Sequence, residues 1–352
     1  MSDSVAVVVL TFNARDFIDP CLASALAQTL PVQVIVADNG SQDGTLAHVR
    51  ERWPAVTALD LGANHGFAGG YNRVLATVEA EWLVLLNPDA TLAPDWCEQL
   101  LAFASTQPEA AVLGGALLFS SAAVSTETVQ SIGSRFTDAG TAFEVGWGQP
   151  LAEQPPARMA PHQTAAIPGA ALLIRRRTFW DLGGFDPGYF AYLEDVDLCW
   201  RAWLAGHEVW VVPQARAWHA FGASSGGRIS PFRIRCMQRN RYANMARLLE
   251  IGTLIIGLAT SIGYDGYRML EYAGHRRWDG LQALWLGTLD AARRLPGWWR
   301  ARPKIQAGRR RTDRDLRRNG LLVSAVAGLH EYRRLQALAA RGKTRQNNDT
   351  RR

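Results

Sequence analysis

Residues 5–13 read VAVVVLTFN, a run of mostly β-branched residues that ends in a polar segment. Parallel strands covered by helices on both faces have such near-continuous apolar sequences. Three further apolar runs follow, at residues 32–37, 56–61 and 82–86. Stretches with helical spacing separate the runs, at residues 16–30, 43–53 and 70–78. This alternation predicts an α/β fold with a mostly parallel sheet and helices on both faces.

Polar clusters lie where the predicted strands and their connections end. They are Thr11-Phe12-Asn13, Asp38-Asn39-Gly40-Ser41, Asn64-His65-Gly66 and Asn87-Pro88-Asp89. Ligands of open α/β sheets bind beyond the carboxyl ends of the strands. The agreement in position among the four clusters therefore predicts a ligand site at this edge of the sheet.

The second half of the chain has weaker signals. Residues 120–165 predict loops with one hairpin, residues 167–174 a strand, and residues 209–212 another strand that ends before Trp218-His219. A helix is expected after Glu194-Asp195. From residue 231 the chain is rich in Arg and Trp and helical in pattern, ending in a basic tail at residues 341–352. We therefore expect one domain over residues 1–230 and a mainly helical C-terminal appendage over residues 231–352.

The net charge of +6 conceals two opposite parts. Residues 1–230 hold 12 Lys and Arg against 23 Asp and Glu, a net charge of −11, whereas residues 231–352 hold 26 against 9, a net charge of +17. Such a split predicts that the second part faces something anionic. The alternative interpretation is that this region is helical and that its arginines are exposed to solvent without binding an anionic partner.

Cysteine spacing and apolar run lengths point to the cytoplasm. The four cysteines are far apart and form no CxxC pair, so buried free thiols are expected rather than a zinc site or disulfides. Residues 5–10 are too short for a signal-peptide core, and the apolar stretch at residues 251–263 is shorter than the roughly 20 residues of a membrane span.

Each polar cluster has a structural and a functional interpretation. Asp38 can accept a hydrogen bond from a pyrimidine, or it can belong to a turn that leads into a helix. Asp89 can bind Mg²⁺ or Mn²⁺ beside a diphosphate, although an Asn-Pro-Asp sequence is also an ordinary turn. Glu194, Asp195 and Asp197 form an acidic cluster that indicates a pocket or a solvated helix start. His219 fits a metal ligand or a structural histidine.

Together, six segments in order resemble glycosyltransferase family 2, particularly its rhamnosyltransferase-like branch. They are residues 10–13, 37–44, 64–72, 86–89, 183–186 and 194–198, within a similarity over roughly residues 5–225. The resemblance implies a GT-A fold, a nucleoside diphosphate-sugar donor, a divalent metal (Mg²⁺ or Mn²⁺) and inversion at the anomeric carbon. It also implies a nucleotide-binding half at residues 1–115 and an acceptor and catalytic half at residues 116–230.

The same resemblance assigns roles to individual residues. Asp195 would be the catalytic base, and Asp89 and His219 the metal ligands. The donor would contact Thr11, Phe12, Asn13, Asp38, Asn39, Ser41, Asn64, Asn72 and Asn87. The acceptor pocket would include Gly169, Ala170, Glu194 and Asp197. One departure is that Asn87 occupies the first position of the family's DxD motif, which should weaken metal binding, although the branch shares this Asn-Pro-Asp sequence.

The expected reaction is transfer of a sugar, with dTDP-rhamnose as one candidate donor, onto a glycan or polyprenyl-diphosphate-linked acceptor during cell-wall or lipopolysaccharide synthesis. We expect a cytoplasmic enzyme held by its basic region at the inner face of an anionic plasma membrane. A nucleotidyltransferase or dehydrogenase is disfavoured, since neither a Gly-, Arg- and Lys-containing loop nor GxGxxG follows the first strand. A nucleic-acid-binding protein lacks support because no such module is present.

Overall fold

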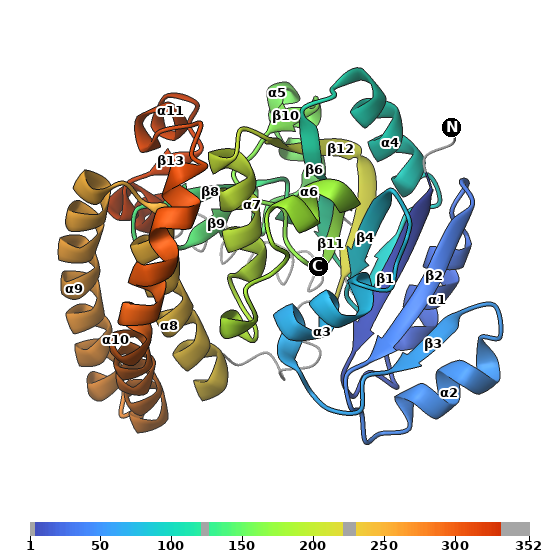
Figure 1. The fold of residues 1–352 in the computed structure, drawn as a ribbon, viewed down its shortest axis with the longest axis horizontal. Helices are drawn as coiled ribbons and strands as arrows, with labels where there is room; N and C mark the ends of the chain where they lie inside the picture. Colours follow the sequence, from blue (N-terminus) through green and yellow to red (C-terminus); the bar gives the residue numbers. More distant parts are fainter. Residues whose placement is uncertain (1–3, 121–126, 221–229, 332–352) are drawn as a thin grey trace, which may run out of the picture.

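The computed structural model describes residues 4–120, 127–220 and 230–331. Its main sheet has ten strands, and eight of them run in the order β10-β12-β6-β11-β4-β1-β2-β3 (Figure 1). Strand β5 pairs with β12, and β7 pairs with β6. A second sheet has the order β13-β8-β9. The strands are β1 Val5–Thr11, β2 Val32–Asp38, β3 Thr57–Asp60, β4 Trp82–Leu86, β5 Ala90–Leu92, β6 Ala110–Phe119, β7 Val129–Ser131, β8 Ser134–Thr137, β9 Ala142–Glu144, β10 His162–Gln163, β11 Ala171–Arg175, β12 Glu208–His219 and β13 Leu322–Val323.

The helices fall into two groups along the chain. Those before residue 220 are α1 Ile18–Leu26, α2 Thr45–Arg52, α3 Gly66–Leu75, α4 Trp96–Thr106, α5 Pro156–Met159, α6 Arg176–Asp181 and α7 Glu194–Leu204, with short 3-10 turns at Leu151–Glu153 and Pro187–Tyr189. The C-terminal group is α8 Pro231–Leu248, α9 Ile251–Gly274, α10 Trp278–Ala307 and α11 Asp313–Arg318.

Helices cover both faces of the sheet, as the sequence predicts. Alternate side chains of β1 point to opposite faces. Val8 belongs to a core that includes residues of α3 and α7, whereas Val7 and Val9 belong to a core that includes residues of α1 and α4. The strands β1, β2, β3 and β4 are parallel to their neighbours in this group. Strand β1 lies between β2 and β4, and in sheets of this kind ligands bind beyond the carboxyl ends of the strands at such a position.

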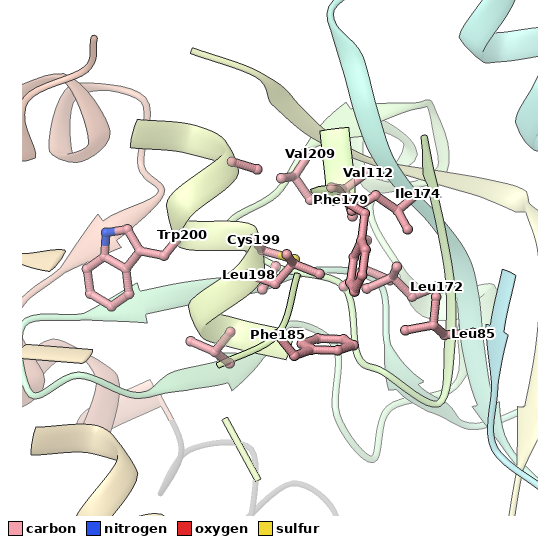
Figure 2. Close-up of a cluster of buried hydrophobic side chains, with 14 of the residues drawn as sticks. Leu85, Val112, Leu172, Ile174, Phe179, Phe185, Leu198, Cys199, Trp200 and Val209 are labelled. Atoms are coloured by element: carbon pink, nitrogen blue, oxygen red, sulfur yellow. The ribbon is translucent and has the colours of Figure 1, made fainter. Parts of the chain in front are cut away.

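The first of these cores fixes α7, which carries the acidic cluster, against the sheet. Figure 2 shows Leu198 and Cys199 of α7 beside Phe179 and Phe185, with strand residues such as Leu172 behind them. Trp200 turns the other way and stacks on Phe136, with ring centroids 4.2 Å apart. Burying large side chains on several sides leaves the helix little freedom to shift.

The C-terminal helical region is present, and it is joined to the N-terminal part through a common core. Met245 of α8 and Leu316 of α11 lie in the same cluster as Val8 of β1. Strand β13 pairs in parallel with β8. Among the described helices, none combines the length and apolar character that crossing a membrane requires. The basic tail at residues 341–352 lies outside the described residues.

Several predicted boundaries are wrong. Helix α3 begins at Gly66 rather than Gly70, so Asn64-His65-Gly66 leads directly into it. Strand β12 continues to His219 instead of ending at Val212, because the pairing with β6 resumes after an irregularity between Val212 and Arg216.

The strand expected at residues 167–174 is β11, which is antiparallel to β4 and β6. The hairpin expected within residues 120–165 is formed by β8 and β9. All four cysteines are free and buried, as predicted.

Candidate active site

The carboxyl ends of β1 and β2 bring the first two polar clusters together. The register pairs Thr11 with Asp38, and the Thr11 hydroxyl donates a 3.0 Å hydrogen bond to an Asp38 carboxylate oxygen. The other oxygen of Asp38 accepts from the Ser41 amide at 2.9 Å. Asn13 accepts from the Gln42 amide at 2.8 Å, and Phe12 is 48% exposed beside these groups in the sequence. The edge therefore combines an ordered polar floor with an exposed aromatic ring, a combination suited to a base and ribose.

Asn39 links this edge to the start of α3. Its amide donates to Asn64 Oδ1 at 3.2 Å and to the Gly66 carbonyl, and it accepts from the His65 amide. Gly66 has φ +71°, and a Cβ at this position would lie 2.5 Å from the Phe190 carbonyl oxygen. Only glycine permits this backbone and this close approach. Asn39 and Asn64, both predicted donor residues, thus connect the carboxyl end of β2 to the start of α3, where Gly66 approaches the loop before α7.

Asp89 and His219 meet because β5 pairs with β12. The antiparallel register places His219 opposite Ala90, next to Asp89. His219 Nε2 lies 3.1 Å from Asp89 Oδ1, and both side chains are 11% exposed. Asn87 Nδ2 lies 3.4 Å from the same ring nitrogen. On the other side of the ring, Nδ1 lies 3.0 Å from Gln130 Nε2, so Gln130 fixes the ring orientation.

Two donors of this kind fit a divalent metal that takes its other ligands from a diphosphate and water. An octahedral ion with ligands at about 2.1 Å holds neighbouring ligand atoms about 3.0 Å apart. The 3.1 Å separation of His219 Nε2 and Asp89 Oδ1 agrees with this geometry as well as with an ordinary hydrogen bond. Within the described ranges, no group of three or more His, Cys, Asp or Glu forms a complete protein metal site.

Asp195 lies at the start of α7 with its carboxylate held by backbone amides. One oxygen accepts from Gly169 at 2.8 Å, and the other accepts from Val196 at 2.8 Å. Burial raises the pKa of Asp195, and these hydrogen bonds oppose the rise. Its surroundings thus orient a carboxylate and make it a better proton acceptor than an exposed aspartate. Ala170, next to Gly169, accepts through its carbonyl from the Asn87 amide at 2.9 Å, so this loop spans the two clusters.

The two acidic neighbours of Asp195 differ from each other. Glu194 is buried, and burial together with the charge of Asp195 raises its pKa well above the usual value. Its Oε2 has no hydrogen-bond partner among the described residues. Asp197 is fully buried and accepts from Arg201 at 2.6 Å and from Arg247 at 3.2 Å. Burial raises the pKa of Asp197, but both arginines outweigh it and hold that pKa low. Its position in this ion network does not fit the acceptor-pocket role expected for it.

The loop before α7 is held by the C-terminal helix α8. Phe190, Tyr192 and Leu193 all have positive φ, from 62° to 70°. Such backbone costs of order 1–3 kcal/mol per residue and needs support from its surroundings. Asn240 of α8 provides this support because its Nδ2 lies 3.1, 2.9 and 2.7 Å from the carbonyl oxygens of Tyr189, Ala191 and Tyr192.

Another predicted donor residue, Asn72, is used inside the protein. Its amide donates to the Phe185 carbonyl at 2.7 Å and accepts from the Phe185 amide at 2.9 Å. Both polar ends of the side chain therefore bind the backbone that leads to the acidic cluster. This arrangement gives Asn72 a part in positioning that backbone, and the donor contact expected for it stays a prediction.

Three residues of the site lie outside the sequence motifs: Gln130, Glu144 and Asn240. Glu144 in β9 accepts a hydrogen bond from the buried Ser131. Burial raises the pKa of Glu144 to about 8, with a contribution from the charge of Asp195. Gln130 and Glu144 come from the weakly patterned segment between residues 120 and 165, and Asn240 from an arginine-rich helix. Local pattern offered no signal for any of them.

Comparison with known proteins assigns the class. The family model described as "Glycosyl transferase family 2" matches residues 6–183. The chain belongs to glycosyltransferase family 2, and it is a glycosyltransferase with a GT-A fold.

Relatives with named activities are similar over different shares of the chain. The N-acetylglucosaminyl-diphospho-decaprenol L-rhamnosyltransferase of Mycobacterium tuberculosis is 33% identical over 245 residues, which are 64% of this chain and 79% of the relative. The rhamnosyltransferase WbbL of Escherichia coli is 47% identical over 51 residues, 14% of this chain and 19% of the relative. Among solved structures, one similar to this chain is the mannosyltransferase PcManGT of Pyrobaculum calidifontis in complex with GDP-Man and Mn²⁺. The two are 17% identical with a TM-score of 0.53, and the match covers 82% of this chain and 86% of the mannosyltransferase chain.

Proposed function

We propose that this glycosyltransferase moves rhamnose from dTDP-rhamnose onto a hydroxyl of a sugar linked to a polyprenyl diphosphate, with inversion at the anomeric carbon. The observation that carries the proposal is Asp195, an oriented carboxylate with a raised pKa, held by Gly169 beside the loop that contacts Asn87 at the end of β4. The name of the 33% identical relative supports the sugar and the lipid-linked acceptor.

Asp195 acts as the base in a single displacement. Its carboxylate removes the proton of the acceptor hydroxyl, and the oxygen forms a bond to the anomeric carbon. The bond from that carbon to the diphosphate oxygen breaks, and the nucleoside diphosphate leaves with the electron pair. A positioned base contributes about 10²- to 10⁴-fold to the rate. The Gly169 and Val196 amides keep the carboxylate in one orientation.

Asp89 and His219 would hold a Mg²⁺ or Mn²⁺ ion, with Asn87 and Gln130 around them. Such an ion supplies positive charge to the diphosphate as negative charge develops on it. Thr11, Phe12, Asn13, Asp38 and Ser41 would bind the base and ribose at the ends of β1 and β2. Asn39 and Asn64 would keep those ends in register with the Asp195 loop.

The acceptor proposed here would be embedded in a lipid bilayer, so the enzyme would work at the inner face of the plasma membrane. The positive C-terminal region, with a net charge of +17, supports a location against anionic lipid.

Replacement of Asp195 tests the proposed chemistry. Asp195→Asn keeps the size of the side chain and one of its two acceptor oxygens but removes the base, so turnover should fall at least about 100-fold while donor affinity stays within about threefold. Transfer and calorimetric donor binding should be measured on the same preparation. Asp181→Asn, a change of an exposed carboxylate on α6, serves as the control.

The dependence of turnover on pH tests the role of Asp195 independently. Because burial raises the pKa of Asp195, the activity of the natural chain should be lost as pH falls through a value above the ordinary aspartate value of about 3.9. Turnover by Asp195→Asn within about tenfold of the natural chain, with the acid limb unchanged, would remove Asp195 from this role.

A further inference from the structure

Helix α9 buries polar residues against the protein, beside the apolar Leu254. The residues that it buries against the protein include Gly257, Ser261 and Asp265. Asp265 pairs with Arg241 of α8 and accepts hydrogen bonds from Gln238 and Tyr242. Gly257 lies so close to the Asp138 carbonyl that a Cβ there would be 2.1 Å from its oxygen. Amphipathic helices of globular proteins have the opposite arrangement, with the apolar stripe facing the core.

The outer face of α9 is apolar and uncharged. Every exposed side chain between Ile251 and Leu270 lacks a charge. Ile255 is 64% exposed, Ile262 is 69% exposed and Leu270 is 75% exposed. Residues 255 and 262 are two turns apart and lie on one side of the helix, at the edge of the exposed face that borders the buried Ser261 and Asp265. Figure 1 places α9 at the rim of the molecule, on the side away from β1, β2 and β3.

Aromatic and basic side chains lie near the C-terminal end of this face. Tyr267 is 50% exposed, and Arg268 lies over the rings of Tyr264 and Tyr272. Trp278 and Trp285 at the start of α10 are 61% and 59% exposed. Tyrosine and tryptophan favour the headgroup level of a bilayer, and arginine pairs with its phosphates.

Some arginines at residues 293–318 make contacts within the protein, although most arginines of this stretch have exposed side chains. Arg302 donates to the Ala246 carbonyl, and Arg309 pairs with Asp313. Arg311 pairs with Glu208 and lies over the Trp203 ring, while Arg317 pairs with Asp138. Arg311 and Arg317 therefore join the C-terminal region to the catalytic part, while the exposed arginines of the same stretch add positive charge to the surface.

We propose that the outer face of α9, centred on Ile255, Ile262 and Leu270, inserts into the headgroup and acyl boundary of an anionic bilayer, with the helix lying along the surface. A second copy of the chain is a poorer occupant, because it would bring one +17 region against another, whereas anionic lipid attracts that charge. The proposal extends the proposed function, since it names the surface that brings the enzyme to a lipid-linked acceptor.

Cosedimentation with vesicles tests the proposal on the full chain. Vesicles of equal parts phosphatidylglycerol and phosphatidylcholine should bind the protein, pure phosphatidylcholine vesicles should bind it less, and added salt should weaken the binding. The double variant Ile255→Gln with Ile262→Gln removes apolar area but retains residues that suit an exposed helix. Its apparent affinity for the anionic vesicles should fall at least about tenfold.

Leu26→Gln is the matched control, because Leu26 is an exposed leucine of α1, 38% exposed, in the catalytic part. It should bind vesicles like the natural chain. Both variants should unfold at the temperature of the natural chain and should transfer sugar to a water-soluble acceptor at its rate, which separates lost membrane binding from lost folding.

Three results would overturn the proposal. The natural chain could stay in the supernatant with anionic vesicles at low salt, or the double variant could bind as tightly as the natural chain. Light scattering could also show a dimer that the double variant converts to a monomer, which would assign the face to a second copy. Failure of the proposed function looks different, because vesicle binding would then persist without sugar transfer from any nucleotide donor.

Discussion

At the scale of single residues, the pair formed by Asp89 and His219 depends on a three-residue ladder. Strand β5 contributes Ala90–Leu92, and its antiparallel register with β12 sets the 3.1 Å contact between the two side chains. Gln130 then holds the opposite nitrogen of the imidazole. A carboxylate and an oriented imidazole placed in this way suit a metal beside a diphosphate.

Asp89→Ala should expose this dependence. Without its carboxylate, the chain should bind nucleoside diphosphate at least about tenfold more weakly in Mn²⁺ than the natural chain does, and equally well in EDTA. Calorimetry in the two buffers measures both values, and Asp181→Ala controls for loss of an exposed carboxylate. An equal loss of affinity in Mn²⁺ and in EDTA would show that Asp89 acts on the structure of the site alone.

The residues of the site differ in how far sequence could predict them. Thr11 and Asp38 each end an apolar run, and parallel strands bring such ends to one edge, so their contact follows from pattern. Gln130 and Glu144 are placed by short strands in a segment of weak periodicity, and only tertiary contacts bring them to His219 and Asp195. Asp197 was misjudged because sequence does not show that Arg247, fifty residues later, shares its carboxylate.

At the scale of elements, α8 supports the loop that positions Asp195, although α8 itself supplies none of the proposed catalytic groups. The three carbonyls that approach the Asn240 amide belong to the loop before Asp195, whose backbone is left-handed at three non-glycine residues. Loss of the amide would remove this donor from the Ala191 and Tyr192 carbonyls, whereas Arg239 would still donate to the Tyr189 carbonyl, and the loop would lose support.

Asn240→Ala should therefore lower turnover at least about tenfold, because the loop that positions Asp195 loses its support. Donor affinity should stay within about threefold, because the residues proposed to bind the nucleotide at the ends of β1 and β2 do not contact Asn240. The free energy of unfolding should fall by about 1–3 kcal/mol. Gln306→Ala is the control, since Gln306 donates to the carbonyls of Arg247 and Leu248 at the other end of α8. It should cost similar stability without the loss of turnover. Equal turnover in the two variants would reduce Asn240 to a structural residue.

Pattern fixes the kind of an element better than its direction or its length. The apolar runs of β1, β2 and β4 identify buried strands correctly. The run of β11 is equally apolar, but nothing in its composition shows that it is antiparallel to both neighbours. Strand β12 extends beyond its apolar run. After an irregularity in pairing, more exposed and buried residues alternate from Gln214 to His219, so this part of the strand has no continuous apolar sequence.

At the scale of the whole molecule, the C-terminal region and the catalytic part share one core. Leu316 of α11 is fully buried in the cluster that also holds residues of β1 and α7. Strand β13 extends the small sheet through β8, and Asp138 after β8 pairs with Arg317. We therefore expect the two parts to unfold together.

Leu316→Ala should lower the free energy of unfolding by about 2–5 kcal/mol. Helical signal by circular dichroism and release of bound nucleotide should shift to the same lower midpoint, because the damage reaches the donor site through the common core. Arg314→Ala changes a residue on the exposed side of α11. It should alter the free energy of unfolding by no more than about 0.5 kcal/mol, as expected of a surface substitution, so both midpoints should stay close to those of the natural chain. Separate midpoints for the two signals would mean that the C-terminal region is an independent unit.

The pairing of β5 with β12 has a consequence for synthesis on the ribosome. Asp89 emerges long before His219, and the strand that must lie beside β5 is among the last parts of the sheet to be made. A nascent chain that has emerged as far as β6 already carries the residues of β1 and β2 but has no partner for Asp89. Such a chain cannot form the pair of Asp89 and His219, so the metal site proposed for these residues can assemble only after β12 has been made.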